Sequence, residues 1–182
     1  MLVPLGFLGV NSKYDYELIS TQILASNAAT VTFSAIDQTK YKHLQLRVTG
    51  RTTYTGGVDV LTVQFNGDTG ANYASHRLQG DGTSATGASF TSQTYANMGF
   101  VVGDNSTANI FGASVIDILD AFSATKVKTL RGVQGSNASS NLVAVKSGLW
   151  INTASVSSIV LGTTGAGNFM TGSRFSLYGV RG

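Results

Sequence analysis

Histidine, serine and aspartate are the residues of this chain that could supply acid–base or nucleophilic chemistry. His43 and His76 are the only histidines. A catalytic triad needs a histidine that hydrogen-bonds a nucleophilic serine and is oriented by a carboxylate, and Asp59, Asp68 or Asp81 could be that carboxylate. The chain has no Gly-x-Ser-x-Gly segment to expose a serine on a strained turn. We therefore interpret both histidines as structural or surface residues.

Paired carboxylates are the second chemistry to consider, because glycosidases use two of them. Asp117 and Asp120 are the closest acidic pair in a segment that reads as ordered. Three residues apart in a strand, their side chains point to opposite faces. Asp117 lies between two isoleucines, so we expect it to be partly buried and to accept hydrogen bonds from an arginine or the backbone. Asp120 is expected to end the strand in a turn.

Two glycine-rich segments superficially resemble ion-binding loops. Residues 66–70 (NGDTG) lack the closing glutamate and the full ligand set of an EF-hand, and we interpret them as a hairpin turn. A two-loop calcium site shared with Asp81 or Asp104 remains an alternative. Residues 80–83 (GDGT) lack the lysine of a phosphate-binding loop. With no cysteine and no histidine pair at ligand spacing, we expect no metal, no cofactor and no catalytic residue.

Aromatic side chains could bind sugars by stacking on their ring faces. Tyr54 and Tyr73 lie near glycine-rich turns and are the tyrosines that we expect to be exposed. Trp150, the only tryptophan, stands between Leu149 and Ile151 in an apolar run. That position favours the core over a binding platform.

Charge is scarce, since only 12% of the residues are Asp, Glu, Lys or Arg and the net charge is +3. An ordinary soluble domain has about 25%. The only local concentration of basic residues is Lys126, Lys128 and Arg131, and the two lysines would share one face of a strand. This scatter argues against nucleic acid as a partner. No apolar span reaches the ~20 residues needed to cross a bilayer, so we expect no membrane partner.

The elements that must position these residues are strands. Period-two alternation and β-branched residues predict nine to eleven of them, over residues 18–24, 30–33, 43–53, 58–66, 95–102, 115–119, 126–133, 142–151, 156–161 and 174–180. Clusters of Gly, Asn, Asp, Ser and Thr separate them, as turns require. Short strands at regular spacing, without helical interludes, predict an all-β fold, either an antiparallel sandwich or a barrel.

Three local features refine this pattern. Residues 30–33 are expected to pair with residues 18–24 across a turn at residues 26–28. The alternation slips at Val60 and Leu61, which predicts a bulge or a strand covered on both faces. Only residues 34–42 (SAIDQTKYK) could form a helical turn.

The chain is expected to form one domain over residues 14–182, preceded by an extended N-terminal arm over residues 1–13. Exposed apolar side chains in this arm would be stabilised by docking on a partner. A first strand of the same sandwich is the alternative. The docking residues of the arm would be Leu2, Val3, Leu5, Phe7, Leu8 and Val10.

Several strings over most of residues 14–182 resemble virion structural domains of tailed bacteriophages. They are residues 16–20 (YELIS), 41–47 (YKHLQLR), 63–73 (VQFNGDTGANY), 78–83 (LQGDGT), 115–120 (VIDILD), 128–131 (KTLR), 147–152 (SGLWIN) and 172–182 (GSRFSLYGVRG). Such domains recur as capsid-decorating (cement) proteins and as terminal domains of tail fibres. The resemblance implies a jelly-roll-like sandwich, often assembled as a trimer, and marks no catalytic residue.

These observations lead to a functional expectation. The chain resembles a non-enzymatic capsid cement protein that binds the major capsid protein on the outer surface of a phage head, as a homo-oligomer, expected to be a trimer. The alternative is a tail-fibre or receptor-binding domain that recognises host glycans through Tyr54 or Tyr73. A hydrolase is the weakest reading, because the sequence shows no acid–base constellation.

Overall fold

The computed structural model describes residues 15–137 and 141–181, and no helix occurs among them. Twelve strands make up the fold: β1 (Tyr16–Ile23), β2 (Val31–Phe33), β3 (His43–Gly50), β4 (Val58–Phe65), β5 (Tyr73–Gly80), β6 (Ala85–Gln93), β7 (Ala96–Val102), β8 (Gly112–Leu119), β9 (Lys128–Ser136), β10 (Leu142–Trp150), β11 (Ile159–Thr163) and β12 (Arg174–Val180).

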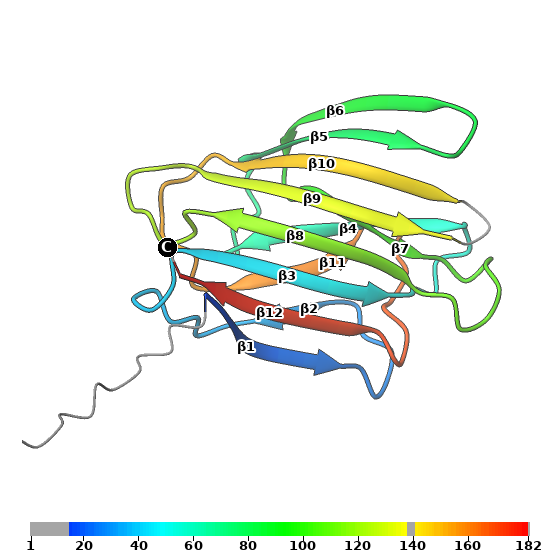
Figure 1. Ribbon diagram of the computed structural model, residues 1–182, viewed down its shortest axis with the longest axis horizontal. Helices are drawn as coiled ribbons and strands as arrows, with labels where there is room; N and C mark the ends of the chain where they lie inside the picture. The colour runs from blue at the N-terminus through cyan, green and yellow to red at the C-terminus, as the bar shows by residue number, and fades with distance from the viewer. Residues whose placement is uncertain (1–14, 138–140, 182) are drawn as a thin grey trace, which may run out of the picture.

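The strands form two antiparallel sheets of unequal size, packed face to face (Figure 1). The large sheet has eight strands in the order β1-β12-β3-β8-β9-β10-β5-β6, and the small sheet has four in the order β2-β11-β4-β7. Every named strand pair is antiparallel. The all-β sandwich predicted from the alternation is therefore confirmed.

The alternation of each strand sorts its side chains between the core and the outer face of the large sheet. On β8, Ile116 and Ile118 are fully buried while Val115 is 40% exposed. On β9, Leu130 is fully buried and Val133 is 60% exposed. Because successive side chains of a strand point to opposite faces, this local pattern fixes which side of each strand meets the small sheet.

The core between the sheets is aliphatic at its centre and aromatic at its ends. Phe65, Tyr73 and Trp150 pack together at one end, with the rings of Tyr73 and Trp150 stacked at 6.3 Å. Phe169 and Phe175 meet edge to face at 4.8 Å in a second aromatic contact. The core position expected for Trp150 is confirmed, since this residue is 1% exposed.

The bulge predicted in residues 58–66 is also confirmed, because the register of β4 against β7 shifts between Leu61 and Thr62. The pairing predicted for residues 18–24 with residues 30–33 is wrong. β1 pairs with β12 in the large sheet, whereas β2 pairs with β11 in the small sheet. The turn between β1 and β2 thus carries the chain from one layer to the other.

Two further turns differ from their prediction. Residues 66–70 do not close a hairpin, because β4 belongs to the small sheet and β5 to the large one. Residues 34–42 form a turn at residues 38–40 that does not continue into a helix, and the Asp37 carboxylate accepts hydrogen bonds from the backbone and the hydroxyl of Thr39. A side chain that satisfies the local backbone in this way competes with helix formation.

β5 and β6 are the strands that the sequence pattern misses. β6 (ATGASFTSQ) has one large apolar residue, Phe90, and most of its residues are exposed. Lys128, expected to share a face with Lys126, is fully buried at the start of β9, whereas the Lys126 side chain is 65% exposed ahead of that strand. The N-terminal arm, with its six apolar docking residues, lies outside the described residues.

Candidate docking surface

A row of four apolar side chains crosses the outer face of the large sheet. Val115 on β8 stands opposite Val133 on β9, Val133 opposite Val145 on β10, and Val145 opposite Leu78 on β5. Their exposed fractions are 40%, 60%, 55% and 62%, respectively. Directly opposite residues on one face have Cβ atoms about 5 Å apart, so the four side chains form a continuous strip. We call Val115, Val133, Val145 and Leu78 the outer row.

The next row of the same face is also free of charge. Val143 is 65% exposed and stands opposite Gly80 on one side and Gly135 on the other. Ala113 continues this row beyond Gly135. Because its neighbours in this row are glycines, the Val143 side chain projects from the sheet. The surface over β8, β9, β10 and β5 is therefore apolar in both rows.

The outer face becomes polar where the outer row meets β3 and β12. Beyond Val115 the outer row continues into Arg47 of β3 and Ser176 of β12. The Arg47 guanidinium lies 4.5 Å from the ring centre of Tyr178. An ion pair between Arg131 and Asp117, 2.8 Å apart, borders the outer row on β8 and β9. Solvated polar groups thus border the outer row, an arrangement typical of an interaction surface.

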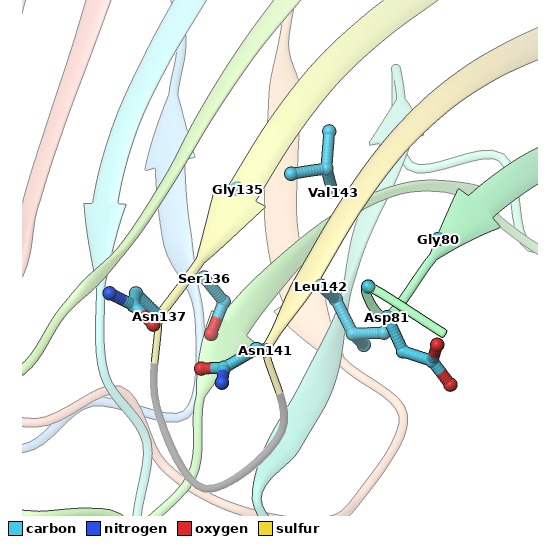
Figure 2. A pocket seen from close by; sticks show the side chains of 9 residues that line it. Gly80, Asp81, Gly135, Ser136, Asn137, Asn141, Leu142 and Val143 are labelled. Carbon is cyan, nitrogen blue, oxygen red and sulfur yellow. The ribbon is translucent and has the colours of Figure 1, made fainter. Parts of the chain in front are cut away.

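Two hollows accompany this surface. One, of about 300 Å³, lies among outer-row residues and the Asp117–Arg131 ion pair. The other, of about 470 Å³, lies where β9 ends and β10 begins, beside the turn after β5 (Figure 2). Figure 2 shows Val143 above this second hollow, with Ser136 and Asn141 at its side. Both hollows adjoin the apolar rows, so a partner's side chains could enter there.

The two tyrosines expected to be exposed are placed differently. The expectation that Tyr73 is exposed is wrong. Its ring is fully buried, and its hydroxyl accepts a hydrogen bond from the Phe65 amide and donates to the Asp68 carbonyl. Burial raises its pKa to about 12. Tyr73 therefore offers no ring face to a glycan. Tyr54 is half-buried, with Gly56, Gly165 and Gly167 close around it.

The two histidines lie apart, on different strands. Nδ1 of His43 accepts a hydrogen bond from the Asp120 amide at 2.8 Å and lies 3.8 Å from the carboxylate of that residue. The Asp120 carboxylate pairs with Lys126, which holds its pKa below the ordinary value. His76 is exposed on β5. The structural role expected for His43 fits this geometry, because its acceptor nitrogen is occupied by the backbone.

The aspartates of the candidate loops are engaged with their own surroundings. Asp117 accepts hydrogen bonds from Arg131 and Gln45 at 2.8 Å, as predicted for a partly buried carboxylate. Asp81 accepts from the amides of Thr83 and Ser84, which close the β5–β6 turn and lower its pKa. Within residues 15–137 and 141–181, no group of three or more His, Cys, Asp or Glu residues could hold a metal ion.

Asp68 anchors the chain where it crosses between the sheets. Its carboxylate accepts hydrogen bonds from Trp150 Nε1 at 2.7 Å, from the Asn72 amide group and from the Gly70 backbone. These donors, with Trp150 first, lower the pKa of Asp68. The residue that the sequence offered as a calcium ligand is therefore a structural acceptor.

The outer row was not predicted from the sequence, although residues 142–151 carry one signal for it. Residues 142–151 are apolar at both strand parities, which indicates a strand with two nonpolar faces. The alignment of four such residues depends on strand register and cannot be read from one segment.

In the described part of the chain, no helix is long and apolar enough to cross a membrane. Comparison with protein-family models, curated proteins and solved structures finds no match.

Proposed function

We propose that the protein is a structural docking module, and specifically a capsid cement protein that binds the outer surface of a phage head. The observation that carries the proposal is the outer row. A strip of half-exposed valine and leucine side chains on a rigid sheet would gain roughly 25 cal/mol for each Å² of apolar area that a partner covers.

Two features of the outer row support this role over a receptor-binding one. The strip is extended and spans four strands, so it fits a protein surface better than a sugar. Charge is scarce along it, so binding through it would be insensitive to ionic strength. The resemblance to phage virion domains supports a place in the virion but is compatible with both roles. The major capsid protein is the proposed partner, and the N-terminal arm would add a second point of attachment.

The test is binding of the purified chain to expanded empty heads of the virus that encodes it, prepared without this protein. Val133→Asp and Val145→Lys should lower head occupancy at least about tenfold, because each places a charge inside the apolar contact. Val127→Asp is the matched control, since Val127 is 40% exposed but precedes β9 and lies outside the outer row.

Equal loss with all three variants, or no loss with any, would contradict the use of this face. Particles that carry only a few copies at the tail would support the tail-fibre alternative. Deletion of residues 1–13 measures the contribution of the arm separately from that of the outer row.

A further inference from the structure

The two edges of the large sheet are protected unequally. At the β1 edge, Glu17 accepts hydrogen bonds from Lys40 and Arg181, and the register against β12 shifts between Leu18 and Ser20. Charged side chains and bulges are the devices by which proteins keep an edge strand from pairing with another chain. This edge therefore has two of them.

The β6 edge has neither device over most of its length. Residues 85–93 contain no charged residue and no proline. The register against β5 shifts only near the end of β6, where Ser92 has a φ of 54°. Ala85 to Phe90 consequently form a regular, uncharged edge, and among residues 15–137 and 141–181 no strand pairs with the backbone N–H and C=O groups on its free side. Figure 1 shows this strand at the rim of the large sheet, beyond β10 and β5.

We propose that this edge pairs with β6 of a second copy, so that the two large sheets become one continuous sheet. The pairing would be antiparallel, about a two-fold axis perpendicular to the sheet. Such an axis keeps the side chains of the outer face on the same side in both copies, and we place it at Gly87, within the regular stretch of β6.

A second copy fits this edge because the edge is compatible with itself. The residue on a two-fold axis faces its own copy, so a charged residue there would meet a like charge, and the residues on either side of the axis face each other reciprocally. β6 has none, and its residues on the outer face are the small Ala85, Gly87 and Ser89, whose side chains would not clash across the seam. The self-complementarity that an isologous contact demands is thus present in the strand.

The pairing also extends the candidate docking surface. Leu78 of the outer row stands opposite Gly87 of β6, so the outer rows of both copies would lie on one face, on either side of the seam. Two docking strips on one rigid body bind a repetitive surface with higher avidity than either strip alone. The inference does not rest on the proposed function, because the edge would pair with or without a capsid. It yields two copies, not the expected trimer, since an edge strand has one free side.

The experiment is sedimentation equilibrium and native mass spectrometry on the full chain and on Gly87→Lys. A Cβ at Gly87 meets no atom closer than 3.7 Å, so the substitution fits the fold. The wild-type chain is expected to form a two-copy species. In Gly87→Lys, two ammonium groups meet across the axis, and the dissociation constant should rise about tenfold or more. Gly135→Lys is the matched control, because its Cβ would lie in open space on β9, away from the edge.

Mixing Gly87→Lys with Gly87→Asp tests directly whether the two copies meet at residue 87. A two-fold pairing predicts that the mixture forms a species with one copy of each variant, whereas each variant alone dissociates. A monomeric or trimeric wild-type chain would overturn the proposal, and so would a mixture that does not recombine. Loss of the two-copy species on removal of residues 1–13 would also overturn it, because the N-terminal arm of one copy, and not β6, would then be what binds the other copy. Gly135→Lys should impair head binding while leaving the pair intact, which separates failure of this inference from failure of the proposed function.

Discussion

Lys146 shows most directly how single residues are matched to this interior. Its ammonium donates hydrogen bonds to Asn97 Oδ1 at 2.6 Å and to the Gly99 carbonyl at 3.0 Å, and it lies 4.0 Å from the centre of the Phe100 ring. Burial, together with the positive charge of Arg77 opposite it on β5, lowers the pKa of Lys146 to about 7. A buried cation is thus held by two oxygens and a ring face.

This pKa predicts a specific dependence of stability on pH. Between pH 7 and about 10 the unfolded chain carries a proton on Lys146 that the folded chain does not, so the free energy of unfolding should rise with pH across that window. The expected gain is a few kcal/mol. Denaturant titrations from pH 6 to 10 measure it. Lys146→Met should flatten the rise, whereas Lys126→Met, at an exposed lysine, should leave it in place.

The Trp150–Asp68 hydrogen bond makes a second prediction at the same scale. Asp68→Ala leaves the buried indole N–H without its acceptor and should lower the free energy of unfolding by about 1–3 kcal/mol. Asp68→Asn retains an acceptor oxygen for Trp150 and should lose clearly less. Urea denaturation followed by tryptophan fluorescence measures both variants. Equal losses would mean that the negative charge, and not the indole partner, is what the site requires.

At the scale of the elements, glycines set how closely segments approach. A Cβ on Gly103, directly after β7, would come within 1.9 Å of the Gly56 carbonyl oxygen, which lies in the loop before β4. The atoms that such a Cβ would meet belong to the backbone of Gly56 and Tyr54, which cannot move aside as a flexible side chain could. The contact joins the segment that leaves one strand of the small sheet to the segment that enters its neighbour.

Gly103→Ala should therefore lower the free energy of unfolding by roughly 2 kcal/mol or more, the range of other overpacking substitutions. Gly135→Ala, where a Cβ meets open space, should change it by no more than about 0.5 kcal/mol. Thermal denaturation of both variants tests the comparison. Similar melting temperatures would show that the Gly103 loop relaxes without cost.

The elements also show how far a sequence pattern carries. Ten of the twelve strands are predicted from the sequence, because alternation and β-branched residues are local signals that each of them carries. β5 and β6 are missed for a physical reason. At the rim of the large sheet β6 gains little burial, so its sequence needs no apolar alternation, and backbone pairing with β5 is what holds it in place.

At the scale of the whole molecule, scarcity of charge predicts how its contacts respond to salt. The proposed β6 contact and the proposed outer-row contact are both uncharged, so their dissociation constants should change less than about threefold between about 0.05 and 0.5 M NaCl. Contacts that depend on ion pairs weaken steeply over that range. Sedimentation equilibrium and head binding at several salt concentrations provide the measurement, and a steep loss would mean that charged rim residues dominate.

The sequence alone is sufficient for the all-β class, for the antiparallel sandwich and for the core position of Trp150, because alternation and turn chemistry are local properties. Only the tertiary structure decides that four exposed apolar residues from β8, β9, β10 and β5 stand in one row, and that β6 is a free edge. Strand order and register arise from contacts between segments far apart in the chain. Tyr73 illustrates the same limit: its neighbouring turn indicates exposure, but packing against Phe65 and Trp150 buries it.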